Sequence, residues 1–100
     1  MITKTFEKTV ATGTATALET TGTQVRKIII YADPANTVPV FIGNLNVTAA
    51  NGFPIPIGGA LTLDNEDRGF GRYDTAEIFA IATIAAQKLR IILLGKGAPV

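Results

Sequence analysis

The chain contains no cysteine, histidine, tryptophan or serine. Without cysteine there is no disulfide, thiolate nucleophile or zinc–thiolate centre, and without histidine the commonest metal ligand and general base are missing. Catalytic triads that combine serine or cysteine with histidine are therefore excluded by the composition itself. Only carboxylate, lysine, tyrosine or threonine chemistry is left, and we expect a protein that is not an enzyme and needs no cofactor.

Charged residues are also scarce. Asp, Glu, Lys and Arg make up 17% of the 100 residues, against about 25% in typical domains. The formal net charge is +1 without a long run of either sign, so the basic surface of a nucleic-acid or anionic-membrane binder is not indicated. The start of the chain, MITKTFEKTV, lacks the apolar core of a signal peptide. We expect a soluble protein, made in a cytoplasm, that binds neither nucleic acid nor membrane.

β-Branched residues and turn signals predict an all-β chain. Nine of the fourteen threonines lie within the first 23 residues, so residues 1–23 are expected to form an extended Thr-rich N-terminal arm or edge strand. In residues 24–100, strands are predicted in QVRKIIIYAD, VPVFIG and ALTL, which turn residues separate. The length suits one domain. We expect residues 24–100 to form a small antiparallel β-sandwich or barrel-like domain.

The segment AEIFAIATIAAQKLRIILLG, residues 76–95, fits either one long helix or two strands joined by a turn. A surface helix needs a polar face every 3.6 residues, and large apolar side chains lie all around this one. Its β-branched content also favours strands. We therefore predict a hairpin, EIFAIAT followed by QKLRIILLG.

The second strand of this hairpin is apolar on both faces. One face carries Leu89, Ile91 and Leu93, while Ile92 and Leu94 lie on the other together with two cations. A strand with two apolar faces is usually covered on both sides. In so small a domain the second cover is expected to be another subunit, so Ile92 and Leu94 are predicted interface residues.

Residues 43–63 combine turn formers with large apolar side chains. In the run FPIPI the two prolines fix an extended backbone, and alternation places Phe53, Ile55 and Ile57 on one side. These three residues are predicted to form a buried apolar clasp. The clasp either closes its own sandwich or contacts a neighbouring chain, and the sequence leaves both possibilities open.

Residues 31–63 and 77–95 together resemble a pattern found in small virion proteins of tailed bacteriophages. In that pattern a strand ending in Gly-Asn leads into a Val-Thr turn, a Gly-x-Pro loop, a Leu-Thr-Leu strand and a closing hairpin. The resemblance leaves out the Thr-rich first quarter of the chain. It implies a β-sandwich, often trimeric, that serves as a capsid decoration (cement) or head-fibre module and has no catalytic residues. Because no long fibre extension is present, the decoration role is expected.

Two other motifs are weak. Asp64, Glu66 and Asp67 form the one cluster of oxygen ligands, but the spacing of an EF-type calcium loop is missing, so a solvated acidic turn is expected. Residues 68–71, RGFG, match the first half of an RNA-recognition signature that then fails. We therefore predict neither a metal site nor an RNA-binding site.

The sequence thus predicts a phage virion structural protein that decorates and stabilises the assembled head. Its expected partners are further copies of itself, most simply as a homotrimer, and the major capsid protein. Thr3, Thr5, Phe6 and Thr9 of the arm are the expected capsid contacts, which act by adding a strand to a neighbour's sheet. The alternative is a head-fibre or tail-associated carbohydrate-binding module, which the small number of aromatic residues disfavours. The expected location is the capsid surface of the virion, after synthesis in the host cytoplasm.

Overall fold

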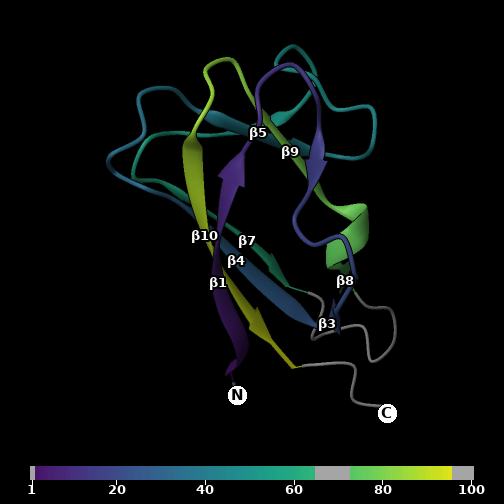
Figure 1. The fold of residues 1–100 in the computed structure, drawn as a ribbon. Helices are drawn as coiled ribbons and strands as arrows, with labels where there is room; N and C mark the ends of the chain where they lie inside the picture. The colour runs from purple at the N-terminus through teal and green to yellow at the C-terminus, as the bar shows by residue number, and fades with distance from the viewer. Residues whose placement is uncertain (1, 65–72, 96–100) are drawn as a thin grey trace.

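A computed structural model describes residues 2–64 and 73–95 of the chain (Figure 1). Two four-stranded antiparallel sheets make up most of it. The first sheet has the strand order β1 (Ile2–Val10), β10 (Gln87–Leu94), β4 (Lys27–Ala32) and β7 (Ala60–Asp64). The second has the order β2 (Thr16–Ala17), β9 (Phe79–Ala82), β5 (Val40–Gly43) and β6 (Phe53–Ile55). A short pair, β3 (Gln24–Val25) with β8 (Tyr73–Asp74), and the 3-10 helix η2 (Thr75–Glu77) complete the described elements.

The hydrophobic core lies between the two sheets. Alternate residues of β4 and β10 are buried, as expected for strands with one face toward a core. Both sheets contribute fully or almost fully buried aliphatic side chains, among them Val10, Ile28, Ile30, Leu89, Ile91 and Leu93 from the first and Val40, Ile42, Ile55, Ala80 and Ala82 from the second. Each large aliphatic side chain contributes roughly 1.5–3 kcal/mol by leaving water. The predicted all-β fold class is confirmed.

The last two strands form as predicted, but the hairpin between them is wrong. β9 pairs with β5 and β2 in the second sheet, whereas β10 pairs with β1 and β4 in the first. The connection at residues 83–86 therefore crosses from one sheet to the other, and Ala86 adopts a left-handed φ of 67° within it. β9 offers only four residues for pairing, while the nine-residue β1 pairs with β10 from Ile2 to Val10, with one irregularity between Ile2 and Lys4. The longer ladder gives β10 more backbone hydrogen bonds than a hairpin with β9 would.

The Thr-rich segment 1–23 contributes to both sheets. Its first part is the edge strand β1, which runs beside β10 in Figure 1 and ends at the fully buried Val10. The chain then crosses to the second sheet, where β2 pairs with β9. Both backbone groups of Thr23 are hydrogen-bonded to Thr75. The Thr23 N–H donates to Thr75 Oγ1 at 2.8 Å, and the Thr23 carbonyl accepts from the Thr75 N–H at 3.2 Å. The fold continues through residue 23 without a break.

The loop after β5 packs against its own sheet through Val47, which is 4% exposed. A Cβ atom at Gly43 or at Gly52 would approach Val47 Cγ2 to 2.7 Å, so both positions need glycine for this close contact. Thr48 and Asn51 close the turn in between, since the Thr48 N–H donates to Asn51 Oδ1 at 2.7 Å. Turn-forming residues and a large apolar side chain thus occur together in this loop because Val47 sits over two glycines.

Ile55 is buried in its own chain, but the alternative in which the clasp closes its own sandwich is wrong for Phe53 and Ile57, and their contact with a neighbouring chain stays a prediction. Ile55 is 1% exposed, whereas Phe53 is 58% and Ile57 46% exposed. Ile57 lies in a turn closed by the Gly59 N–H, which donates to the Pro56 carbonyl at 2.8 Å, so its side chain points to solvent. Gly58 has the positive φ of 75° that such a turn requires. Phe53 is the first residue of β6, where the chain leaves an exposed turn.

Within residues 2–64 and 73–95, no helix has the length and hydropathy needed to cross a membrane.

Candidate interaction surface

The outer face of the first sheet points away from the core. Residues that lie opposite each other in an antiparallel ladder share a face, so the strand registers define its membership. The outer face consists of Ile2, Thr5, Glu7 and Thr9 on β1, Lys88, Arg90, Ile92 and Leu94 on β10, Lys27, Ile29 and Tyr31 on β4, and Ala60, Thr62 and Asp64 on β7. In the described part of the chain, no other strand layer covers this face.

An apolar strip runs through the middle of the outer face. One row across the four strands reads Thr5, Ile92, Ile29, Thr62. The two isoleucines are half-buried and the two threonines are exposed. Tyr31 and Leu94 extend the strip along the central strands and are also half-buried. An apolar strip in the centre of an open sheet face is compatible with a surface that contacts another protein.

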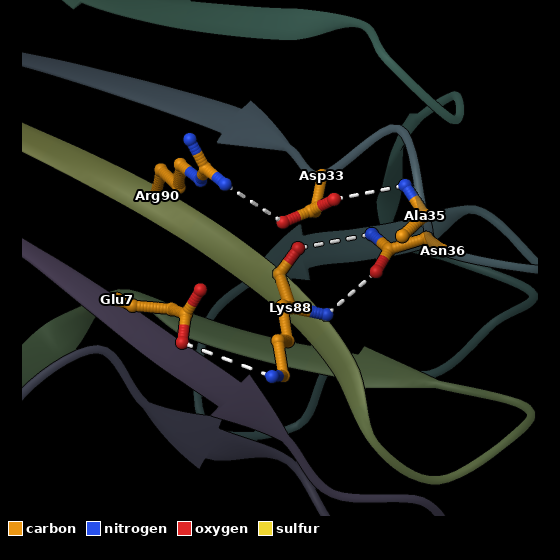
Figure 2. A network of polar contacts seen from close by, with 6 residues as sticks. All are labelled: Glu7, Asp33, Ala35, Asn36, Lys88 and Arg90. Atoms are coloured by element: carbon orange, nitrogen blue, oxygen red, sulfur yellow. Dashed lines mark hydrogen bonds and ion pairs between the residues drawn. The ribbon is translucent and has the colours of Figure 1, made fainter.

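A polar network closes one end of the outer face (Figure 2). Arg90 Nη2 lies 3.3 Å from Asp33 Oδ2, and Lys88 Nζ lies 3.9 Å from Glu7 Oε1. The Asn36 side chain pairs with the Lys88 backbone as a neighbouring strand would. Its amide donates to the Lys88 carbonyl at 2.9 Å and its Oδ1 accepts from the Lys88 N–H at 2.7 Å. The network therefore fixes the turn after β4 against β10. At the opposite end, Lys27 Nζ lies 3.8 Å from Asp64 Oδ2.

A shallow hollow of about 270 Å³ indents the first sheet at β1 and β10. It is lined by Thr5, Phe6, Glu7, Arg90, Ile91 and Ile92. Four of these six residues belong to the outer face, so the hollow adjoins the apolar strip.

A second hollow, of about 490 Å³, lies between β1 and residues 18–23. Lys4, Phe6 and Lys8 line it from β1, and Leu18 and Glu19 line it from the other side. Glu19 forms an ion pair with Lys4 and accepts a hydrogen bond of 2.7 Å from Thr75 Oγ1. Lys8 is half-buried and has no acidic partner in the described part of the chain.

The contacts of Glu19 lower its pKa. Burial of the carboxylate raises the pKa, but hydrogen bonds with Lys4, Thr75 and Thr23 and the positive charge of Lys4 outweigh burial, so the pKa lies below its ordinary value.

Stability should therefore depend on the ionisation of Glu19. Its contribution is fully present above the pKa of an unfolded glutamate, about 4.3, and is lost as the pH falls through the lower pKa of the folded state. In the Glu19→Gln variant we expect the free energy of unfolding to fall less steeply as the pH is lowered from 7 to 3. Urea unfolding at a series of pH values measures this. Glu77→Gln, at an exposed position, controls for the loss of one negative charge. Parallel curves for Glu19→Gln and the unchanged protein would contradict the role of these contacts.

The predicted capsid contacts lie on both sides of β1. Thr5 and Thr9 are exposed, on the side that points away from the core. Phe6 lies on the opposite side, half-buried against the core. Thr3 lies in the same strand.

The structure brings some predicted interface residues together and separates others. Ile92 and Leu94 lie side by side on the outer face of the first sheet. Ile55 is in the core, and Phe53 and Ile57 are exposed on or beside β6, in the second sheet. Sequence reasoning missed Ile29 and Tyr31, although KIIIYA, residues 27–32, is apolar on both faces just as the last strand is.

Residues 65–72 lie outside the described part of the chain, and with them Glu66, Asp67 and the RGFG motif at 68–71. Asp64 ends β7 and pairs with Lys27. In residues 2–64 and 73–95, no group of three or more Asp, Glu, His or Cys residues could hold a metal ion. Comparison of the chain with protein-family models, with curated proteins and with solved structures finds no match.

Proposed function

We propose that the protein is a capsid decoration protein of a tailed bacteriophage, which binds the assembled head and stabilises it without catalysing a reaction. The resemblance of residues 31–63 and 77–95 to small virion proteins supports the class. The observation that carries the mode of binding is the long edge strand β1. In this proposal the partner is the major capsid protein and the location is the outer surface of the head.

β1 can accept a strand from another protein. In the described part of the chain it pairs with β10 alone, so none of the described strands occupies the backbone groups along its other edge. Exposed edges of this kind bind extended segments through main-chain hydrogen bonds. Thr5 and Thr9 are exposed along the strand. A segment of the capsid protein would extend the first sheet next to them.

Two lysines restrict which strands can add to this edge. Lys4 and Lys8 share the core-facing side of β1 with Phe6 and Val10, and inward-pointing charges are a common protection of edge strands against indiscriminate pairing. Lys4 is paired with Glu19. Because Lys8 has no acidic partner in the described residues, we expect the added strand to carry an aspartate or glutamate beside it.

Stabilisation of the head follows from mass action. A ligand that binds the assembled shell but not its free subunits shifts the equilibrium toward assembly, and the effect grows with the ratio of ligand concentration to Kd. Many copies on one shell add their contributions.

The test is co-sedimentation with undecorated, expanded shells of the capsid protein encoded in the same genome, together with the melting temperature of the shells. We expect the unchanged protein to bind and to raise the melting temperature. Lys8→Glu should weaken binding by about tenfold or more, equivalent to ~1.4 kcal/mol, because like charges would then meet. Thr83→Glu, exposed in the connection between β9 and β10, controls for the addition of one negative charge away from β1.

No binding by the unchanged protein would reject the decoration role. Equal binding by Lys8→Glu would reject the edge of β1 as the contact. A deletion of residues 1–12 is a poorer variant, because it removes a whole strand together with the buried Val10.

No observation favours the carbohydrate-binding alternative. Sugar sites usually present exposed aromatic rings, and among the described residues Phe53 is the one aromatic side chain with more than half of its surface exposed.

A further inference from the structure

The central row of the outer face is a palindrome across the sheet. Its residues, Thr5, Ile92, Ile29 and Thr62, come from β1, β10, β4 and β7 in that order. Consider a second copy stacked face to face on this sheet and related to it by a two-fold axis that runs parallel to the strands, midway between β10 and β4. In such a pair β1 of one copy lies over β7 of the other, and β10 lies over β4. Two copies related by this axis would place Thr5 against Thr62 and Ile92 against Ile29. The row is therefore complementary to itself.

The next row remains complementary under the same exchange. It reads Glu7, Arg90, Tyr31, Ala60, so Arg90 of one copy would face Tyr31 of the other. Arginine stacks well on an aromatic ring, and it keeps its hydrogen bond to a carboxylate while doing so. The ion pair of Arg90 with Asp33 fits that arrangement.

The row on the other side is Ile2, Leu94, Lys27, Asp64. The exchange places Leu94 of one copy against Lys27 of the other. The aliphatic stem of Lys27 can cover the leucine while its ammonium group reaches solvent. Ile2, which is 59% exposed, would face Asp64. In none of the three rows does a charge meet a like charge, a juxtaposition that disfavours an interface.

The hollow of about 270 Å³ lies where this pairing needs space. It opens beside Thr5, Glu7, Arg90 and Ile92, and the exchange places β4 and β7 of the second copy over β1 and β10. Tyr31 is the largest side chain on those two strands and would point into the hollow next to Arg90. Aromatic residues that fill a pocket at the centre of an interface commonly dominate its binding energy.

We propose that the outer face of the first sheet binds the same face of a second copy of this chain about a two-fold axis parallel to the strands. Facing sheets pack about 10 Å apart with strands about 30° from parallel, and a two-fold axis that bisects that angle is compatible with this geometry. The inference stands independently of the decoration role. It differs from the trimer that the resemblance implies.

The size of the face predicts weak pairing. Four strands about 4.8 Å apart and about five residues long at about 3.3 Å per residue give a footprint of roughly 20 Å by 17 Å. Standard interfaces bury about 800 Å² on each partner. The footprint is smaller than that, so we expect a dimer that forms at high concentration and dissociates on dilution.

Cross-linking tests the axis directly, because the chain has no cysteine of its own. Thr5→Cys and Thr62→Cys are made as separate variants with tags of different size and treated with a short bismaleimide, alone and as a mixture. The mixture should give a hetero-dimeric product several times more abundant than the homo-dimeric product of either variant alone. Thr83→Cys, exposed outside the face, should cross-link to neither. Equal products in every combination, or none at any concentration, would overturn the proposal.

Sedimentation equilibrium provides the second measurement. We expect masses that rise with concentration from one chain toward two, and Ile92→Lys should raise the dissociation constant at least tenfold. Ile84→Lys is the matched control, since Ile84 is 50% exposed in the β9–β10 connection. A mass of three chains, or the same response to both substitutions, would contradict the two-fold pairing. Because Lys8 lies on the opposite side of β1, shell binding and self-association can fail separately.

Discussion

Replacement of Ile55 by alanine is expected to lower the free energy of unfolding by about 3 kcal/mol. Truncation of a buried isoleucine loses its transfer free energy and leaves a cavity, for a total cost of about 2–5 kcal/mol. Ile55 is 1% exposed and lies opposite the fully buried Val40. Because β6 is the last strand of its sheet in the described chain, Ile55 anchors that edge to the core.

Phe53→Ala is the control for Ile55→Ala. Phe53 belongs to the same strand two residues earlier but is 58% exposed, so its truncation should cost less than about 1 kcal/mol. Urea unfolding at neutral pH, with the slope m compared among the three proteins, gives both values. Equal losses for the two variants would mean that Phe53 is buried, either in its own chain or against a second copy.

Gln87→Leu is expected to cost about 2–3 kcal/mol. Gln87 is 4% exposed, and its side-chain oxygen accepts from the Thr37 N–H at 2.7 Å and from the Val38 N–H at 3.2 Å. Its amide nitrogen donates to Thr37 Oγ1 at 3.1 Å and to the Ala85 carbonyl at 3.3 Å. Leucine fills a similar volume but removes the partner of these groups. Because Thr37 and Ala85 are exposed, water can replace part of the lost bonding, and the expected total lies near the upper end of the cost of one unsatisfied buried group, about 1–3 kcal/mol.

The measurement combines urea unfolding with hydrogen exchange of the Thr37 and Val38 amides. Both amides should exchange faster in Gln87→Leu, because they lose their acceptor. Gln24→Leu is the matched control, since Gln24 is exposed in β3 and surface substitutions usually change stability by less than about 0.5 kcal/mol. Unchanged exchange at Thr37 and Val38 would show that another group replaces the glutamine.

Strand positions could be predicted where the local composition determines them. KIIIYA and QKLRIILL are rich in β-branched and aliphatic residues, and both appear as strands in the structure. Strand pairing could not be predicted, because it depends on contacts between distant residues. The contact of Asn36 with Lys88, for example, joins positions 52 apart in the sequence, and no local pattern distinguishes it from a hairpin.

The candidate surface was predictable in part for a similar reason. Apolar residues on both faces of the last strand pointed to Ile92 and Leu94, and the structure places these residues on the outer face of the first sheet. Ile29 and Tyr31 likewise belong to a strand with apolar residues on both faces. Their place on this surface is known only from the strand register, which pairs them with Ile92 and Arg90. The expectation that Ile57 closes its own sandwich beside Ile55 is wrong because β6 ends at Ile55, and alternation in the sequence does not extend the strand.

The position of β10 determines when this chain can fold during its synthesis. β10 lies between β1 and β4, so the first sheet joins the beginning of the chain to residues 87–94. Until the ribosome has released those residues, β4 can pair with β7, but no strand lies between β1 and β4 and β1 lacks its partner in the sheet. Folds dominated by such distant pairings have high contact order and fold in milliseconds to seconds. The nascent chain therefore carries an incomplete first sheet until residues 87–94 have been synthesised, and during that interval the lysines that point inward from β1 would limit aggregation at its edge.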